Sequence, residues 1–399
     1  MMLQIFSSRR QPIKTLYLIY QVLSTVFIRL PYWIVIYAPK HRRPRPSWSL
    51  KRSVMVNLMR RLCYVSARPS EIFVSPNHLA ISDGPGIKGV WVEAAPHLIT
   101  GDVALWASIA NVKPTRIPGY WIDKRGVDIP TGQKPIAGEK VLYSLHGGAY
   151  TQLSAHPKDS VGVIIRNIIR HCQPVQRAFA LEYRLSSTDP LPNANPFPAA
   201  LIDAIAGYYY LVNTVGFDPS DVIIEGDSAG GNLAIALTRY LVEHRDRPEI
   251  PPAPDGIILV SPWTDLSNSH DRPNSSLTTS SADYLIDPNS MCGLWSRQAF
   301  LGPHGLGAAC FNRYISPASL RITASFTGFP RTFLVTGGAE KLYDSIFTLK
   351  NKMVADMGEG DGEGQVTYYE CPDAVHDYIA FPWYEPERTD TLRAIAKWI

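Results

Sequence analysis

Length, composition and charge are those of a sizeable globular protein. The chain has 399 residues, of which 45% are hydrophobic and 19% charged, and its formal net charge is +4. This composition excludes intrinsic disorder. The small positive excess, concentrated near the N-terminus without interleaved base-stacking aromatics, excludes a nucleic-acid partner. The five cysteines are scattered without CxxC spacing, which argues against a disulfide framework and a zinc site, and no motif suggests a metal or organic cofactor.

The first feature along the chain is an apolar segment, residues 16–37, between basic flanks. As a helix this segment spans about 33 Å, enough for the hydrocarbon core of a bilayer. Arg29 past its middle and Pro31, which is expected to kink it, weaken a simple spanning helix. Three interpretations stay open: a spanning anchor, an in-plane helix with Arg29 reaching the headgroups, and a cap helix over an apolar pocket. Membrane attachment through one N-terminal anchor, intracellular or at the endoplasmic reticulum, is favoured over a soluble cytoplasmic protein.

The rest of the chain divides into a cap region and a larger domain. Residues 46–115 follow the N-terminal segment 1–45 and contain two short helical patterns, at 49–64 and 101–111. From 116 to 399, short apolar runs alternate with helical patterns, which predicts a mostly parallel, doubly wound α/β sheet. The predicted strands are 116–123, 140–145, 177–182, 221–225, 256–260, 331–335 and 365–370, and the predicted helices include 199–215, 230–243, 343–357 and 389–399.

The strongest motif is Gly-x-Ser-x-Gly at residues 226–230. An apolar strand precedes it and a helical pattern follows at once, which is the context of a nucleophile elbow. The tight turn needs small neighbours, and Gly226 and Gly230 meet that need. Ser228 is therefore the predicted nucleophile and Asp227 a supporting residue. The competing interpretation is an ordinary strand–helix turn with a capping serine.

A second glycine motif follows the predicted strand at 140–145. His146, Gly147 and Gly148 stand there in sequence. Consecutive glycines let backbone N–H groups approach a ligand, so the amides of Gly147 and Gly148 are expected to form an oxyanion hole with that of Ala229. His146 is interpreted as a supporting residue that fastens the loop, and an ordinary glycine turn is the alternative.

A general base and an acid are expected after the serine in the chain. His376 follows the predicted strand 365–370 and is the candidate base. Glu340 and Asp344 follow the strand 331–335, where parallel strands present catalytic groups. Glu340 is preferred as the acid that orients His376 because it lies in the irregular loop, whereas Asp344 is expected in the first helical turn as a supporting acid. A structural histidine and solvated turn carboxylates are the alternatives.

These motifs together resemble the hormone-sensitive-lipase-like family of α/β-hydrolases, including its steryl acetyl hydrolase and carboxylesterase branches. The likeness covers about residues 115–399, and the resemblance implies the α/β-hydrolase fold with an N-terminal helical cap. Two departures stand out: Ala149 replaces a third glycine, and Glu340 occupies the position where the family usually has aspartate. The matching segments are 146–148, 183–185, 197–199 with Asp203, 226–232, 261–267 and 392–399.

The sequence therefore predicts a serine carboxylic-ester hydrolase that forms an acyl-enzyme. Its expected substrate is an apolar small-molecule ester, for example an acetyl or short-acyl ester of a lipid, sterol or secondary metabolite. Acyl transfer by the same triad is one alternative. A non-catalytic small-molecule receptor is the other, although such relatives typically lose a triad member and Ser228 and His376 are both present.

Overall fold

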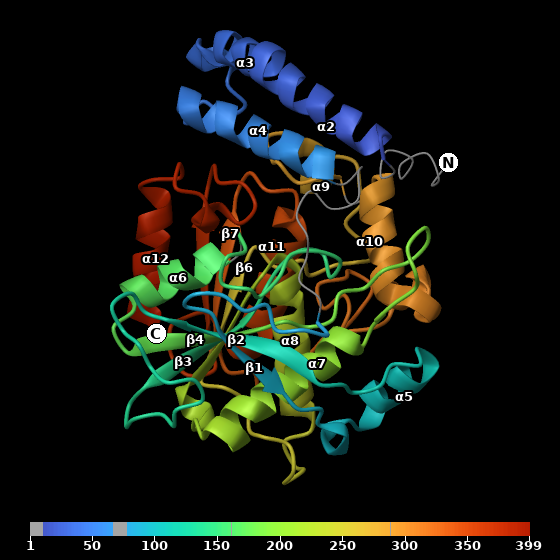
Figure 1. Cartoon of the computed structure of the whole chain (residues 1–399), viewed down its shortest axis with the longest axis vertical. Coiled ribbons are helices and arrows are strands. Elements are labelled where there is room, and N and C mark those ends of the chain that lie inside the picture. Colours follow the sequence, from blue (N-terminus) through green and yellow to red (C-terminus); the bar gives the residue numbers. More distant parts are fainter. Residues whose placement is uncertain (1–10, 67–77, 161, 288) are drawn as a thin grey trace.

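The computed structural model describes residues 11–66, 78–160, 162–287 and 289–399. Its centre is an eight-stranded sheet in the spatial order β1-β2-β4-β3-β5-β6-β7-β8 (Figure 1). β2 runs antiparallel to both of its neighbours, and all other pairs are parallel. The predicted mostly parallel sheet is thus confirmed. The strands are β1 Lys88–Val92, β2 Ile117–Asp123, β3 Lys140–Leu145, β4 Val175–Leu181, β5 Val222–Asp227, β6 Gly256–Val260, β7 Arg331–Gly337 and β8 Val366–Cys371.

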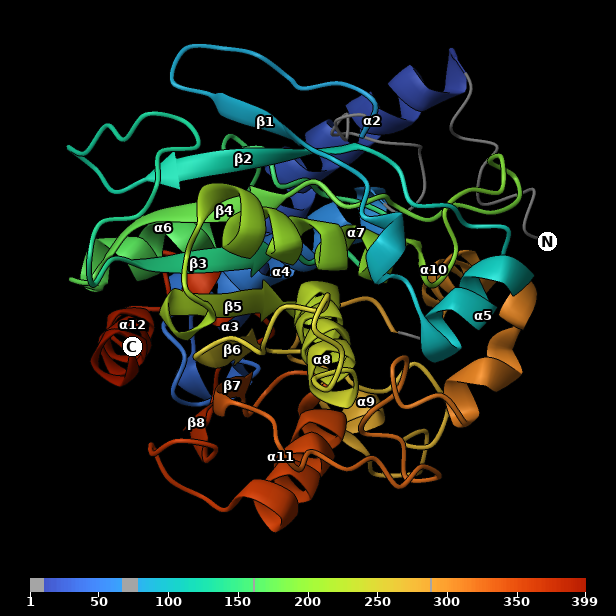
Figure 2. The same ribbon diagram turned by 90° about the horizontal axis from the view of Figure 1, so that it is seen from below.

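Helices cover both faces of this sheet (Figure 2). Successive side chains of a strand point to opposite faces. In β5, Val222 and Ile224 join one apolar core while Ile223 joins the other. The buried strands are apolar throughout because both faces are packed. The first core is covered by α7 Ala199–Tyr209, α8 Ser228–Glu243 and α11 Tyr343–Met357, and the second by α6 Gly162–His171 and α12 Glu387–Trp398.

Apart from the four-residue helix α9, three strands or α-helices are absent from the sequence prediction. β1 lies within the range 46–115, expected as cap region, yet it joins the edge of the sheet. α6 is rich in isoleucine, which disfavours a helix locally, but its isoleucines recur at helical spacing and are buried on the sheet. α10 Met291–Leu301 lies in a stretch that looks polar in sequence. Tertiary packing determines all three. The remaining helices are α5 Gly101–Ile109 and α9 Ser276–Thr279.

The N-terminal apolar segment is one continuous helix, Ile13–Tyr37. It comprises α2 Ile13–Ser24, a π-helical turn Thr25–Arg29 and α3 Leu30–Tyr37. Pro31 removes one backbone donor, and the wide turn directly before it absorbs the break in the hydrogen-bond ladder. The helix lies across one end of the molecule, alongside α4 Leu50–Ser66 (Figure 1).

Candidate active site

The Gly-x-Ser-x-Gly motif forms a sharp turn between a strand and a helix. β5 ends at Asp227 and α8 begins at Ser228, whose φ is +50°. A non-glycine residue in this left-handed region is strained, as the nucleophile elbow requires. A Cβ on Gly230 would lie 1.8 Å from the carbonyl oxygen of Leu145, and one on Gly226 would lie 2.3 Å from the carbonyl oxygen of Gly230. The two glycines therefore let strand, turn and neighbouring loop meet.

The predicted oxyanion donors are not equivalent. The N–H of Gly147 donates to Oδ1 of Asp227 over 3.1 Å, so this amide is already engaged. Gly148 has a φ of +107°, and a Cβ there would lie 2.0 Å from the carbonyl oxygen of Gln152. Ala229 lies in the first turn of α8, where N–H groups have no helical acceptor. The amide of Gly147 is thus engaged within the protein, whereas that of Ala229 lies at the open start of a helix.

His146 fastens the glycine loop. Its Nδ1 lies 2.7 Å from the carbonyl oxygen of Gly147, and its ring stacks on Tyr183 with a centroid distance of 4.2 Å. The Tyr183 hydroxyl donates to the His146 carbonyl oxygen over 2.6 Å. Burial lowers the pKa of His146 to about 4, with only a partial offset from its hydrogen bond to the backbone. A neutral, stacked imidazole of this kind holds a loop in place.

A buried ion pair fixes the segment that carries Tyr183. The guanidinium of Arg184 contacts both carboxylate oxygens of Asp203, at 2.8 to 3.1 Å. The backbone N–H of Arg184 also donates to Asp203, over 2.9 Å. Two motifs that lie apart in the sequence therefore meet as one polar clamp behind the glycine loop.

The structure brings His376 and Glu340 together. Nδ1 of His376 lies 2.9 Å from Oε2 of Glu340, and both side chains are buried. The other oxygen of Glu340 accepts hydrogen bonds from the hydroxyl of Thr336 and from the N–H of Gly337, the latter over 2.9 Å. Both residues follow neighbouring parallel strands, β7 and β8. The carboxylate is thus held rigidly against one side of the imidazole.

Asp344 faces a different part of the molecule. Its Oδ2 accepts the backbone N–H of Ser276 over 2.8 Å, and the Ser276 hydroxyl accepts the N–H of Asp344 over 3.1 Å. These reciprocal bonds join the first turn of α11 to the first residue of α9. The arrangement gives Asp344 a helix-linking contact, and of the two candidate acids it is Glu340 that contacts the imidazole.

Asp377 occupies the other side of the imidazole. Its Oδ2 lies 3.1 Å from Nε2 of His376, and its backbone N–H donates to the hydroxyl of Ser261 over 3.1 Å. Burial acts to lower the pKa of His376, but the carboxylates of Asp377 and Glu340 outweigh it and hold that pKa well above its usual value. Within the described chain, no hydrogen bond joins the Ser228 hydroxyl to His376. The sequence analysis missed Asp377, although its place directly after His376 was the available signal.

Asp283 is a second residue that sequence reasoning missed. Its Oδ2 accepts the N–H of Lys341 over 2.8 Å, and its Oδ1 accepts those of Tyr284, over 2.7 Å, and His376, over 3.4 Å. It comes from the connection between α9 and α10 and bridges the loops that carry Glu340 and His376. No local pattern marks such a residue, because its role depends on loops distant in sequence.

The carboxyls beneath the elbow are also perturbed. Burial, followed by the negative charges of Asp377 and Glu225, raises the pKa of Asp227 well above its usual range. Burial likewise raises the pKa of Glu225 to about 7, opposed by a hydrogen bond from the Ser144 hydroxyl. Burial and the mutual repulsion of these carboxyls thus both favour their protonated forms.

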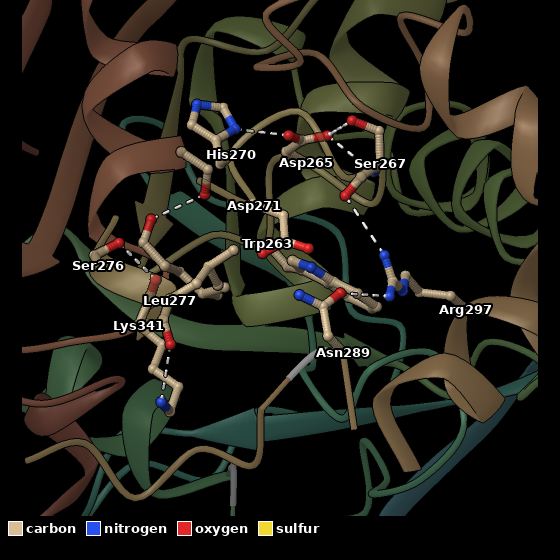
Figure 3. Close-up of a pocket in the computed structure, with 12 residues that line it drawn as sticks. Trp263, Asp265, Ser267, His270, Asp271, Ser276, Leu277, Asn289, Arg297 and Lys341 are labelled. Atoms are coloured by element: carbon tan, nitrogen blue, oxygen red, sulfur yellow. Dashed lines mark hydrogen bonds and ion pairs between the residues drawn. The ribbon is translucent and has the colours of Figure 1, made fainter. Parts of the chain in front are cut away.

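A small polar cavity lies behind the site (Figure 3). Trp263 and Lys341 belong to its lining; the N–H of Trp263 donates to the carbonyl oxygen of Ser228 over 2.8 Å. Within it, His270 contacts Asp265 at 2.6 Å, and Arg297 donates to Asn289 over 3.0 Å (Figure 3). Its volume of about 20 Å³ is room for about one water molecule. The cavity is therefore too small for a substrate. Among the described residues, no group of His, Cys, Asp and Glu is arranged to hold a metal ion.

Comparison with known proteins agrees with this geometry. Residues 142–380 match the model of a family described as having the alpha/beta hydrolase fold. The chain is 30% identical to an acetyl-hydrolase of Streptomyces hygroscopicus, over 65% of this chain and 73% of that protein. It is 27% identical to an esterase of Acinetobacter venetianus, over 61% of this chain and 68% of that protein.

A solved structure shares the fold. The crystal structure of an esterase from the bacterial hormone-sensitive lipase family superposes with a TM-score of 0.54 at 22% identity, covering 92% of this chain and 96% of that one. The strand order, the elbow and these matches lead to one conclusion. The chain belongs to the hormone-sensitive-lipase-like family of α/β-hydrolases and is a carboxylic ester hydrolase.

Proposed function

We propose that this enzyme hydrolyses esters through a serine acyl-enzyme, with Ser228 as nucleophile, His376 as base and Glu340 as the orienting acid. The observation that carries the proposal is the 2.9 Å contact between Nδ1 of His376 and Glu340; the φ of +50° at Ser228, typical of a nucleophile elbow, supports it. This contact fixes the imidazole tautomer and leaves Nε2 for the proton of the serine hydroxyl.

The proposed reaction has two halves. Oγ of Ser228 attacks the ester carbonyl carbon while its proton passes to Nε2 of His376. The carbonyl oxygen becomes an oxyanion that accepts hydrogen bonds from the amides of Gly148 and Ala229. His376 then returns the proton to the departing alcohol, which leaves an acyl group on Ser228. Water, deprotonated by His376, attacks that acyl group, and collapse releases the acid and restores the serine.

The first proton transfer requires a rearrangement at His376. Its Nε2 contacts Asp377 at 3.1 Å, and this contact has to be exchanged for one with Ser228. An imidazolium between two carboxylates cannot accept a proton. The proposed active form is therefore the neutral imidazole, with its Nε2 turned toward the serine.

We propose an apolar ester of a short acyl group, such as an acetyl ester of a lipid, sterol or secondary metabolite. The name of the Streptomyces relative supports the acetyl group.

Replacing the nucleophile tests this mechanism. Ser228→Ala should lower the turnover of p-nitrophenyl acetate by on the order of a million-fold, because nucleophile and base act as a unit. Ser108→Ala, on an exposed residue of α5, should leave it unchanged. Near-normal turnover by folded Ser228→Ala would rule out the serine mechanism. Esters of rising acyl length define the acyl group, and a new ester formed on adding an alcohol would reveal acyl transfer instead of hydrolysis.

We also propose that the helix Ile13–Tyr37 attaches the enzyme to an intracellular membrane, and that the catalytic domain comprises residues 116–399 together with β1, which was expected in the cap region 46–115. The helix has a mean hydropathy of 1.5 in its most apolar window, of which 11% is buried. Deleting residues 1–39 should move the protein from the membrane fraction to the soluble fraction. Full-length protein that is already soluble would contradict the attachment.

A further inference from the structure

The helix Ile13–Tyr37 buries two polar side chains and exposes most of its large apolar ones. Gln21 and Ser24 are its buried residues, and Arg29 turns inward to donate a hydrogen bond to the Ser24 hydroxyl. The outward residues are large, apolar and exposed by roughly half or more. They are Ile13, Leu16, Ile19, Tyr20, Val22, Leu23, Val26, Phe27, Ile28, Tyr32, Ile34 and Val35. This distribution is the reverse of a helix that covers a protein core.

The helix is bound to α4 near its start, and to the connection between α3 and α4 at its end. Toward the start, Arg61 of α4 donates a hydrogen bond to the side-chain oxygen of Gln21. Beyond the end, Arg43 donates to the carbonyl oxygens of Tyr37, over 3.0 Å, and Trp48, over 2.9 Å. α3 packs on α4 between these points. The two helices therefore lie antiparallel, side by side (Figure 1).

α4 is in turn fixed to the catalytic body. Arg52 forms two hydrogen bonds with Glu387 of α12, at 2.7 and 2.8 Å. The indole N–H of Trp48 donates to the carbonyl oxygen of Asp373 over 2.7 Å. The apolar helix thus has a fixed orientation relative to the sheet, and it lies flat across one end of the molecule (Figure 1).

This attachment decides how the helix meets a bilayer. A spanning orientation would carry α4 to hydrocarbon depth beside it, together with Lys51, Arg52, Arg60 and Arg61, and such charges are costly there. An orientation in the plane of the membrane immerses the apolar side alone and leaves α4 in the headgroup layer or above it. We propose that the face formed by α2 and α3 docks the enzyme on a single leaflet of an anionic bilayer, with the helix in the membrane plane.

Charge next to this face agrees with an anionic partner. Lys40, His41 and Arg42 follow the apolar helix directly and are exposed, and Lys51 is exposed at the start of α4. Basic side chains beside an interfacial helix are attracted to anionic headgroups, each strengthening the binding. The apolar side would be buried in the hydrocarbon of the leaflet, and the basic residues after the helix would be attracted to the anionic headgroups.

The docked face is directly connected to the catalytic loops. Arg60 of α4 donates to the carbonyl oxygens of Ser281, Ala282 and Asp283, at 2.7 to 2.9 Å. Asp283 in turn accepts the backbone N–H of His376. The helix α4 and the loop around residues 281–283 thus lie between the membrane face and the base. Resting on the function proposed above, this placement lets the enzyme take esters dissolved in the leaflet.

Matched double substitutions test the docking. Leu16→Asp with Phe27→Asp puts two charges on the proposed face, at residues that are 64% and 71% exposed. Leu105→Asp with Phe311→Asp makes the same chemical change at residues that are 58% and 80% exposed elsewhere. α5, which carries Leu105, lies far from α2 and α3 (Figure 1). Both proteins are compared with the parent by flotation on vesicles of phosphatidylcholine with phosphatidylserine and of phosphatidylcholine alone.

The expected result is loss of binding by the first variant only. Its partition onto anionic vesicles should fall by on the order of tenfold or more, since two large apolar side chains leave the membrane. The parent and the control variant should float, and both should bind neutral vesicles less well. Turnover of an ester dissolved in the vesicles should fall with binding, whereas turnover of soluble p-nitrophenyl acetate should stay unchanged in both variants.

Several outcomes would overturn the inference. If the first variant floats as well as the parent, the face does not dock. If it changes from a dimer to a monomer without any change in flotation, the face binds a second copy of the chain. Tags at the two termini, probed with protease in sealed microsomes, should be accessible from the same side; accessibility from opposite sides would show a spanning helix. If the parent does not hydrolyse the soluble ester, the proposed function is refuted instead. Flotation measures membrane binding alone and does not depend on that activity.

Discussion

Oδ2 of Asp377 lies 3.1 Å from Nε2 of His376, the nitrogen on the side of the imidazole opposite to Glu340. Asp377 reaches this position because its backbone adopts a φ of +47°, in the left-handed region that aspartate tolerates better than most residues. The two residues are adjacent in sequence, so this contact is local. The contact matters for the whole site, because it occupies Nε2, the nitrogen that would accept the proton of Ser228.

Removing this carboxylate should shift the pH dependence of turnover. The charges of Asp377 and Glu340 raise the pKa of His376 against the effect of burial. The imidazolium cannot act as a base, so kcat/KM should rise with pH as His376 loses its proton. Asp377→Asn removes one negative charge, which lowers the pKa of His376 and should move the acidic limb of the profile to lower pH.

The other carboxyl groups of the site are unchanged in this variant, so a shift would report on Asp377 alone. Glu340, Asp283, Asp227 and Glu225 remain in the Asp377→Asn protein. Asp361→Asn, at an exposed loop residue, should leave the profile in place. An unchanged acidic limb in folded Asp377→Asn, or a shift to higher pH, would show that Asp377 does not hold the proton on His376.

The two candidate acids, Glu340 and Asp344, should differ sharply in their effect on turnover. Glu340→Gln should lower turnover by on the order of ten-thousand-fold, because the imidazole loses its oriented acceptor. Asp344→Asn should cost far less activity, since its carboxylate bonds Ser276 and not the imidazole. Melting temperatures establish that both proteins fold. A larger loss in Asp344→Asn would identify it as the acid.

The close approach at the elbow predicts a large penalty for one added methyl group. Gly230→Ala would place a Cβ 1.8 Å from the carbonyl oxygen of Leu145. Because this oxygen belongs to the backbone, the clash is removed only if the strand or the turn moves. The expected cost is about 3 kcal/mol or more in the free energy of unfolding. Gly307→Ala, where nothing lies within 4 Å, should change it by less than about 0.5 kcal/mol. Equal unfolding midpoints in urea would contradict this account.

The clamp behind the glycine loop should stabilise the fold far more than a surface pair does. Asp203→Asn leaves the buried guanidinium of Arg184 without its counter-charge, which typically costs about 3–5 kcal/mol. Asp390→Asn weakens a contact to Arg393 between exposed side chains, 3.5 Å apart, and should cost about 0.5 kcal/mol or less. Urea unfolding of the two variants measures the difference; similar values would show that the buried pair contributes little.

The sequence by itself determined the features that depend on neighbouring residues. Alternating apolar runs and helical patterns predicted seven of the eight strands, and β6 agrees to the residue. The elbow at Ser228 was visible because a tight turn needs glycines at fixed positions around the serine. Local patterns carry this information because strand burial, helix periodicity and turn geometry each act over a few residues.

Only the tertiary structure decided what depends on distant segments. β1 became a strand by pairing with β2, and α6 a helix by packing its isoleucines on the sheet. The engagement of the Gly147 amide by Asp227 and the bridging contacts of Asp283 join loops far apart in the chain. From its sequence, the apolar N-terminal segment was a candidate for a membrane-spanning helix. The contacts with α4 bury its Gln21 and hold it in a fixed, flat orientation, because the side of a helix that faces the protein is set by the element that packs against it.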